Sequence, residues 1–379
     1  MNSHSFSCSS CSMISHANSS ILNCLSCKSP LFVRYCSQNT NIPHSKYWTG
    51  VNIPLPMSHI DDFVSLGEGN TPLVQLNNIN ESLGVNITVK LESLNPTGSF
   101  KDRGTSIMLS VLKTEGVREI VEDSSGNAGA SIAAYAAKSG IKAHIFVPSK
   151  SPQPKLDQIK VYGAILHLVN GTRDETTEAT IAYQKKTKTV YASHNLNPYF
   201  IEGTKIFAYE LYNEFGKNLP TDIIMPVGNG SLYLGTWKGL TELKRKELID
   251  DLPKLHCAQS MSVEPLTAAF MGNHWDQSMI KPTRAGGIAV SLPPRQHQII
   301  KAMSDSGGAA ISVSEEEILD WQLKLSSKEG LFVEPTSATA FAGAIRLIKK
   351  GHISNNSTLL IPITGSGLKD TSPVLGRQD

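Results

Sequence analysis

The chain has 379 residues, of which 40% are hydrophobic and 18% are charged, and its formal net charge is +2 at pH 7. This length predicts two or three domains of about 150 residues each, with enough apolar residues for large cores. The nearly balanced charge excludes any general attraction to nucleic acid or anionic membranes. No apolar run approaches the roughly 20 residues of a membrane-spanning helix.

Five of the six cysteines lie within the first 36 residues. Cys8 and Cys11 form one C-x2-C pair and Cys24 and Cys27 form another, with twelve residues between the pairs. In a zinc ribbon each such pair sits on a turn that directs two sulfurs at one ion. We therefore predict a structural zinc site in a cysteine module that spans residues 1–40. Cys36 and Cys257 are expected to be ordinary thiols.

Two other interpretations of the amino-terminal region stay open. Disulfides would need an oxidising compartment, but no secretory apolar segment precedes these cysteines. A transit peptide fits the serine-rich start and the lack of acidic residues before Asp61, although it does not explain paired cysteines. We expect a cytoplasmic protein and leave organellar import open.

Residues 41–60 contain three prolines and are predicted to be a linker. After Val64, short apolar segments alternate with amphipathic segments, which predicts an α/β fold with mostly parallel sheets. The predicted strands cover residues 86–93, 118–123, 142–148, 164–169, 189–193, 221–228, 255–263 and 357–364. The predicted helices cover residues 101–116, 127–140, 154–163, 176–188, 202–216, 232–247, 314–330 and 338–351.

Residues 95–104 read Asn-Pro-Thr-Gly-Ser-Phe-Lys-Asp-Arg-Gly. Lys101 thus lies in a turn rich in Pro and Gly, with Phe100 before it and an Asp-Arg pair after it. Most lysines are solvated surface charges that need no such setting. A lysine that forms a Schiff base must be aimed and kept partly uncharged, so Lys101 is a candidate nucleophile.

Residues 124–129 read Ser-Ser-Gly-Asn-Ala-Gly, between a predicted strand and a predicted helix. Small residues here leave backbone amides exposed at the positive end of a helix, which suits an anion. A simple helix cap is the alternative, because Ser and Asn are favoured caps. Six small or polar residues in a row exceed what one cap requires, which favours a binding loop.

Two further turns follow predicted strands. Residues 226–232 read Pro-Val-Gly-Asn-Gly-Ser-Leu, and glycines let backbone amides curl around a phosphate. No Gly-Lys-Ser/Thr follows, which excludes a triphosphate-binding P-loop. Residues 364–370 read Thr-Gly-Ser-Gly-Leu-Lys-Asp. Ligands of parallel sheets bind at the carboxyl ends of strands, where all these runs lie.

In this order, and together with residues 65–73, 197–205 and 334–338, the runs resemble the active-site segments of pyridoxal-phosphate enzymes of the threonine synthase and threonine dehydratase group. The resemblance covers about residues 60–370, and some threonine synthase-like proteins also carry an amino-terminal zinc ribbon. It implies a tryptophan synthase β-like fold (fold type II) with two mostly parallel-sheet domains. The catalytic region would span residues 61–379, with a small mobile domain at about 100–215.

The resemblance also implies roles for individual residues. Lys101 would bind pyridoxal phosphate as a Schiff base beside Phe100, and Asn127 would hydrogen-bond the ring hydroxyl. Thr364 would face the ring nitrogen, and a neutral partner there weakens the electron sink and favours elimination over transamination. The substrate carboxylate would bind Ser124, Ser125, Gly126 and Ala128. The cofactor phosphate would bind Gly228, Asn229, Gly230, Ser231 and Leu232.

The leading functional hypothesis is elimination and replacement on a small amino acid, as when threonine synthase converts O-phosphohomoserine and water into threonine and phosphate. Threonine-making members usually carry an Ile-Gly-Asn-Pro stretch with a nearby Trp, whereas residues 282–295 here read differently. The substrate therefore stays open. Candidates for a substrate phosphate are chosen by charge alone: Arg103, Arg284 and Arg295.

Alternatives within the same chemistry are β-elimination or β-replacement on serine, threonine or O-phosphoserine, and the synthesis of a non-protein amino acid. A different class is a zinc-ribbon binding protein with an inactive catalytic domain. The few basic residues near the cysteines, Lys28 and Arg34, argue against nucleic acid. The intact Lys101 argues against an inactive domain. We expect no nucleic-acid or membrane partner and leave a homodimer open.

Overall fold

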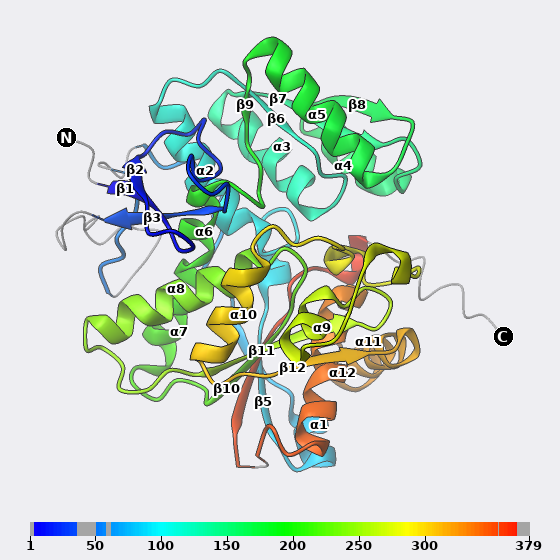
Figure 1. Cartoon of the computed structure of the whole chain (residues 1–379). Coiled ribbons are helices and arrows are strands. Elements are labelled where there is room, and N and C mark those ends of the chain that lie inside the picture. The colour runs from blue at the N-terminus through cyan, green and yellow to red at the C-terminus, as the bar shows by residue number, and fades with distance from the viewer. Residues whose placement is uncertain (1–3, 36–50, 58–61, 355, 370–379) are drawn as a thin grey trace. The chain divides into compact units, whose positions relative to one another are not determined.

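The computed structural model describes residues 4–35, 51–57, 62–354 and 356–369 (Figure 1). Parts of the predicted module and linker, and Cys36, lie outside these residues. The chain forms two compact units. The first unit comprises residues 1–69 and 95–206, and the second comprises residues 70–94 and 207–379.

The first unit begins with a small antiparallel sheet of the order β2-β1-β3. Its strands are β1 (His4–Cys8), β2 (Ile14–His16) and β3 (Leu31–Tyr35). Phe6 in β1 is fully buried. The two cysteine pairs lie in the turns around these strands, which agrees with the predicted module.

The first unit also holds a parallel sheet of the order β8-β7-β6-β9. Strand β7 is buried on both faces, as expected for a parallel strand covered by helices. The strands are β6 (Glu119–Glu122), β7 (Lys142–Pro148), β8 (Ile165–Val169) and β9 (Val190–Tyr191). The helices are α2 (Lys101–Thr114), α3 (Asn127–Ser139), α4 (Gln153–Val161), α5 (Arg173–Thr187) and α6 (Pro198–Thr204).

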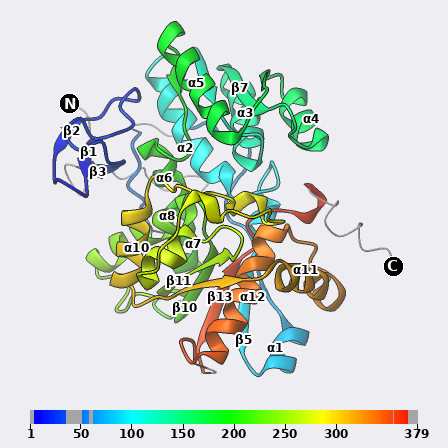
Figure 2. The same cartoon turned by 45° about the vertical axis from the view of Figure 1, so that its right-hand side comes forward.

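The second unit is built on a sheet of the order β12-β11-β10-β13-β5-β4, parallel except for the β4–β5 pair. Helices α7, α8 and α10 cover one face, and α1, α11 and α12 cover the other (Figures 1 and 2). The strands are β4 (Leu73–Gln75), β5 (Asn86–Lys90), β10 (Asp222–Pro226), β11 (Lys254–Ser260), β12 (Ala310–Val313) and β13 (Thr358–Pro362). The helices are α1 (Asn77–Leu83), α7 (Ile206–Phe215), α8 (Ser231–Arg245), α9 (Pro265–Met271), α10 (Gln296–Asp305), α11 (Glu315–Glu329) and α12 (Pro335–Lys349).

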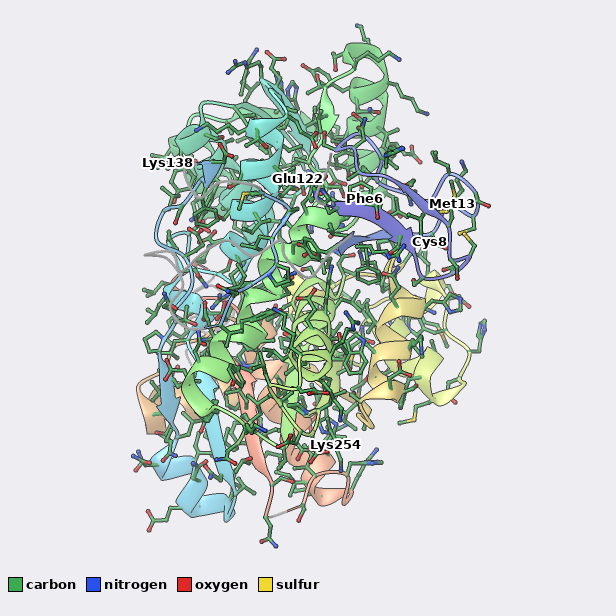
Figure 3. All side chains as sticks on the ribbon, turned by 90° about the vertical axis from the view of Figure 1, so that its left-hand side faces the viewer. Phe6, Cys8, Met13, Glu122, Lys138 and Lys254 are labelled. Atoms are coloured by element: carbon green, nitrogen blue, oxygen red, sulfur yellow. The ribbon has the colours of Figure 1, made fainter. Side chains whose placement is uncertain are left out.

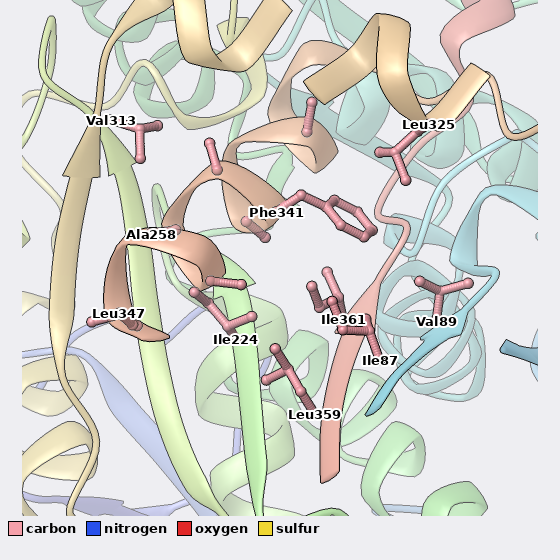
Figure 4. Packing of buried hydrophobic residues seen from close by; sticks show 14 of the residues in the cluster. Ile87, Val89, Ile224, Ala258, Val313, Leu325, Phe341, Leu347, Leu359 and Ile361 are labelled. Carbon is pink, nitrogen blue, oxygen red and sulfur yellow. The ribbon is translucent and has the colours of Figure 1, made fainter. Parts of the chain in front are cut away.

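The core of the second unit lies between α12 and the sheet, where Phe341 and Ile361 are buried (Figure 4). Gly343 lets α12 approach the strands closely, since an added Cβ would lie 2.9 Å from the Cβ of Ala258. This helix is therefore fixed against the strands whose carboxyl ends carry the Gly-rich turns.

The α/β prediction with mostly parallel sheets is confirmed, and all the predicted strands and helices occur. The strands of the cysteine module, β1, β2 and β3, were not predicted individually, and five α-helices and strands after residue 64 were also not predicted: β4, α1, α9, α10 and β12. The helix predicted over residues 202–216 is instead two helices, α6 and α7. Helix α6 begins earlier because Asn197 caps it and Pro198 occupies its first position. Among the described residues, none of the helices combines the length and hydrophobicity needed to cross a bilayer.

Candidate active site and cysteine cluster

Lys101 is the first residue of α2, and the turn before it is fixed by Asp102. The backbone amide and the hydroxyl of Thr97 donate to the Asp102 carboxylate over 2.7 and 2.6 Å. Gly98 lies in this turn with φ = 84°, which favours glycine. Burial raises the pKa of Asp102 to about 6, against hydrogen bonds from Ser131 and Thr97 that lower it. The sequence placed Asp102 in the motif but did not show that it anchors the turn.

The side chain of Lys101 lies among aromatic rings. Its Nζ is 4.6 Å from the ring centroid of Phe100 and 5.8 Å from that of Phe200 in α6. The amine of Lys101 therefore lies near the rings of both Phe100 and Phe200. Phe200 was not assigned to the site from the sequence, although it lies in the run 197–205 that resembles the family.

Residues 123–126 connect β6 to α3, and Asn127 and Ala128 are the first two residues of the helix. The N-cap of α3 is Gly126, which has no side chain to accept from the first amides of the helix. A Cβ on Gly129 would lie 1.8 Å from the carbonyl oxygen of Ser124, so the loop rests directly on the first turn of α3. Ser124, Ser125, Gly126, Asn127 and Ala128 therefore surround one helix end whose amides suit an anion.

Two buried acids at the end of β6 support this loop. The Nδ1 atom of His194 lies 2.5 Å from Oε1 of Glu122. Burial, and then the neighbouring charge of Asp123, raises the pKa of Glu122 well above its usual range. Burial, and then the charges of Lys101 and Arg173, lowers the pKa of His194 well below its usual range. Both directions favour a neutral carboxylic acid that donates to a neutral imidazole.

Asp123 is held by the amino end of α5. Arg173 Nη1 lies 3.1 Å from Asp123 Oδ2 and also donates to the Asp123 carbonyl, and the Thr177 hydroxyl donates to Oδ2 over 2.6 Å. Sequence reasoning missed both acids. The available signal was a Glu-Asp pair directly before the small-residue loop at residues 124–129.

In the second unit, residues 227–230 join β10 to α8, and Ser231 and Leu232 are the first two residues of the helix. Gly230 is the N-cap of α8 with φ = 76°, so this helix also begins without a side-chain cap. A Cβ on Gly228 would lie 2.9 Å from the Cα of Ile288. Ile288 and Val290 therefore pack on this turn. Both belong to residues 282–295, the stretch that differs from the threonine-making members. Gly228, Asn229, Gly230, Ser231 and Leu232 lie together at one strand–helix junction.

Thr364 follows β13 and lies in a polar cluster with residues from the start of α12. Its Oγ1 is 3.1 Å from Oε1 of Glu334 and 2.8 Å from Oγ of Ser337. A Cβ on Gly365 would lie 2.4 Å from the carboxylate carbon of Glu334. The fold therefore brings residues 334–338 together with the described part of the run 364–370, two stretches that the sequence singled out separately.

The three arginines chosen by charge have different surroundings. Arg284 is exposed, whereas Arg103 and Arg295 are each 1% exposed. Arg295 donates to Oε1 of Gln298 over 2.9 Å, and burial lowers its pKa to about 9. Of the three candidates for a substrate phosphate, Arg284 is the one whose side chain is exposed to solvent.

The four module cysteines form one cluster, with all sulfurs within 4.8 Å of one another. The amides of Ser12 and Lys28 donate to the carbonyls of Cys8 and Cys24, and both donors have positive φ, so the two turns are alike. Cys8 lies at the end of β1 beside Met13 (Figure 3). Four thiol sulfurs at this separation match a tetrahedral zinc site.

Hydrogen bonding favours a thiolate at Cys27, where the hydroxyl and then the backbone amide of Ser29 lower the pKa to about 6. At Cys11, a backbone hydrogen bond from Met13 lowers the pKa, but bonds with the neighbouring cysteines raise it to about 12, as expected where one proton is shared among close sulfurs. Cys257, by contrast, is buried in β11 and burial raises its pKa, as expected for an ordinary thiol. The donor chemistry of the module therefore fits a metal ion, and that of Cys257 does not.

Comparison with known proteins places these features in context. A family model described as pyridoxal-phosphate dependent enzyme matches residues 64–365. Threonine synthase of Methanocaldococcus jannaschii is 37% identical over 320 residues, 83% of this chain and 79% of that protein. Threonine synthase of Mycobacterium bovis is 35% identical over 313 residues, 82% of this chain and 85% of that protein.

Solved structures agree. Serine racemase from Dictyostelium discoideum superposes with a TM-score of 0.67 at 25% identity, over 79% of this chain and 92% of that chain. These likenesses confirm the fold of the pyridoxal-phosphate enzymes that the motifs predicted.

Proposed function

Because the chain belongs to the pyridoxal-phosphate-dependent enzymes, we propose that it is a lyase of the threonine synthase type, which converts O-phosphohomoserine and water into threonine and phosphate. The observation that carries the proposal is the setting of Lys101, aimed by a buried Asp102 anchor at the start of α2. The relatives' names support the reaction, and the order of the motifs supports the assignment of residues.

The residues present fit the cofactor. The uncapped start of α8 at Gly230 suits its phosphate, and the hydroxyl of Thr364 suits a ring nitrogen. We assign Lys101, Phe100, Asn127, residues 228–232 and Thr364 to cofactor binding. Pyridoxal phosphate, when bound, supplies the electron sink that makes protons on the substrate carbons acidic.

The chain's own residues then bind the substrate and move protons. Amides of residues 124–128 would bind the substrate carboxylate and orient Cα toward Lys101. The amine of Lys101 would take a proton from Cα, release it, and then take a proton from Cβ on one face of the substrate. Loss of phosphate from Cγ, delivery of a proton to Cγ, addition of water at Cβ and return of a proton to Cα would give threonine.

Zinc and the domain limits belong to the proposal as well. We assign Cys8, Cys11, Cys24 and Cys27 to a structural zinc ion, supported by the cluster of their sulfurs. Four thiolates leave no open position for catalysis. Residues 1–40 would form the zinc ribbon, 41–60 the linker and about 100–215 a domain that moves during turnover. A homodimer and a cytoplasmic location remain further expectations.

The test uses purified full-length protein and its Lys101→Ala variant. The wild type should be yellow and should release phosphate from O-phosphohomoserine, and the variant should lose both the cofactor absorbance and turnover. Lys101→Arg serves as the charge-matched control and should also be inactive. An equally yellow and equally active Lys101→Ala protein would contradict the assignment.

A second reaction has one observation in its favour. The stretch that departs from the threonine-making members packs on the Gly228 turn through Ile288, so the proposed phosphate site is built with an atypical neighbour. Elimination or replacement on serine, threonine or O-phosphoserine is therefore the second candidate. Phosphate release from O-phosphoserine against O-phosphohomoserine, and keto-acid release from threonine, separate the two.

A further inference from the structure

The cysteine module packs on helix α6 through aromatic side chains. The ring of Phe6 lies 5.4 Å from that of Tyr199, and Nε2 of His4 lies 3.1 Å from the Tyr199 hydroxyl. Phe6 and Tyr199 are both buried. Figure 3 shows Phe6 and Cys8 on the same strand, so the strand that carries a predicted zinc ligand also carries the contact with α6.

Tyr35 joins the module to α6 at a second point, where it contacts a buried ion pair of that helix. Lys205 Nζ lies 2.7 Å from Oε2 of Glu202, and neither side chain is exposed. The hydroxyl of Tyr35, the last residue of β3, donates to the same oxygen over 2.5 Å, and its ring lies 4.7 Å from Lys205 Nζ. A buried carboxylate depends on all its donors. The module therefore supplies one of the groups that stabilise Glu202.

Helix α6 in turn lies unusually close to α2. A Cβ on Gly203 would lie 2.0 Å from the carbonyl oxygen of Arg103, and a Cβ on Gly104 would lie 2.4 Å from the ring of Phe200. These contacts are all in the first turn of α2, which begins at Lys101. Close-packed interiors transmit displacements rather than absorb them. A shift of α6 would therefore move Lys101 and the Phe200 ring that faces it.

We propose that Tyr35 and Glu202 are positioning residues for Lys101, through which the cysteine module fixes α6 and the first turn of α2. The proposal rests on the proposed function in that Lys101 is taken as the reacting lysine. It gives the module a role in the reaction, although no cysteine needs to touch substrate or cofactor. Loss of metal from the cluster would release β1 and β3 and so loosen α2.

The test compares Tyr35→Phe with Arg34→Ala in the full chain, after zinc content is measured. Arg34 is the exposed neighbour on the same strand, so its removal changes β3 without touching Glu202. Hydrogen exchange is followed in α2 and α6, with α12 of the second unit as an internal control. Tyr35→Phe should raise exchange in α2 and α6 about tenfold, which is about 1.4 kcal/mol, and leave α12 unchanged.

Kinetics supply the second readout. Because residues 124–128 are not touched, Tyr35→Phe should lower kcat about tenfold and leave KM for the amino acid unchanged. Glu202→Asp, which keeps the charge but withdraws the carboxylate from both Lys205 and Tyr35, should lower kcat at least as much as Tyr35→Phe. Arg34→Ala should match the wild type in both readouts. If Tyr35 only stabilised the fold, Tyr35→Phe would lower the unfolding temperature without lowering kcat at constant KM.

If Tyr35→Phe fails to fold, zinc removal from the wild type by a chelator should produce the same regional exchange. The proposal is overturned by zinc-loaded Tyr35→Phe with wild-type exchange in α2, or by uniform loosening that includes α12. If another lysine proves to bind the cofactor while the exchange pattern holds, the proposed function fails and the mechanical coupling stands.

Discussion

The buried carboxyl of Asp102 should make stability depend on pH in a way that its amide counterpart does not. Burial raises its pKa from 3.8 to about 6, a shift of about two units, or roughly 3 kcal/mol. A raised carboxyl pKa contributes stability that is fully present below about pH 3.8 and is lost as pH rises through about 6. Asp102→Asn removes this ionisation and retains the shape of the side chain.

The assay is chemical denaturation of the cofactor-free wild type and of Asp102→Asn at about pH 4 and pH 8. Contributions from all other groups cancel in the difference between the two proteins. From about pH 4 to pH 8, the free energy of unfolding of the variant should rise by about 2–3 kcal/mol relative to that of the wild type. A difference that does not change with pH would refute the reasoning. A loss of unfolding free energy that is equal at both pH values would come from the altered hydrogen bonds between residue 102 and Thr97.

Three further substitutions test separate parts of the account. Gly129→Ala would displace the loop at residues 124–128, because its Cβ would lie 1.8 Å from the Ser124 carbonyl oxygen. It should raise KM for the amino acid at least tenfold, while absorbance spectra show that the cofactor still binds. Cys24→Ser should abolish stoichiometric zinc, as measured by metal analysis of reduced protein. Gly365→Ala would collide with the Glu334 carboxylate and should weaken cofactor binding at least tenfold by titration of the apoprotein.

Each of these substitutions has a control in the chain. Gly286→Ala meets no atom within 4 Å and should leave KM and cofactor affinity unchanged. Cys257→Ala, at a buried cysteine far from the module in sequence, should retain zinc. Normal KM in Gly129→Ala, full zinc in Cys24→Ser, or unchanged cofactor affinity in Gly365→Ala would each contradict the corresponding assignment.

Local patterns made much of the site predictable. Each candidate segment is a short run of small residues that follows a predicted strand, and both features can be read from the local sequence. These segments contain Lys101, residues 124–128 and residues 228–232. The cysteine pairs were equally accessible, because C-x2-C spacing places two sulfurs on one turn. Their clustering in the structure agrees with that prediction.

Contacts between distant segments were not predictable in the same way. Glu122 and His194 are 72 residues apart, and nothing in either local sequence indicates that they share a proton. Helix α6 was missed as a separate helix because its last residues were assigned to one long helix over residues 202–216, yet it links Tyr35 to α2. The β12 strand is only four residues long, too short for an alternating pattern to identify it.

The central claim, that Lys101 is the residue joined to pyridoxal phosphate, is tested most directly by borohydride reduction followed by peptide mass spectrometry. Reduction fixes the cofactor on whichever lysine it occupies. We expect the pyridoxyl mass on the peptide that contains Lys101, in close to one copy per chain. Labelling of a different lysine, or no stoichiometric label in a yellow protein, would contradict the account.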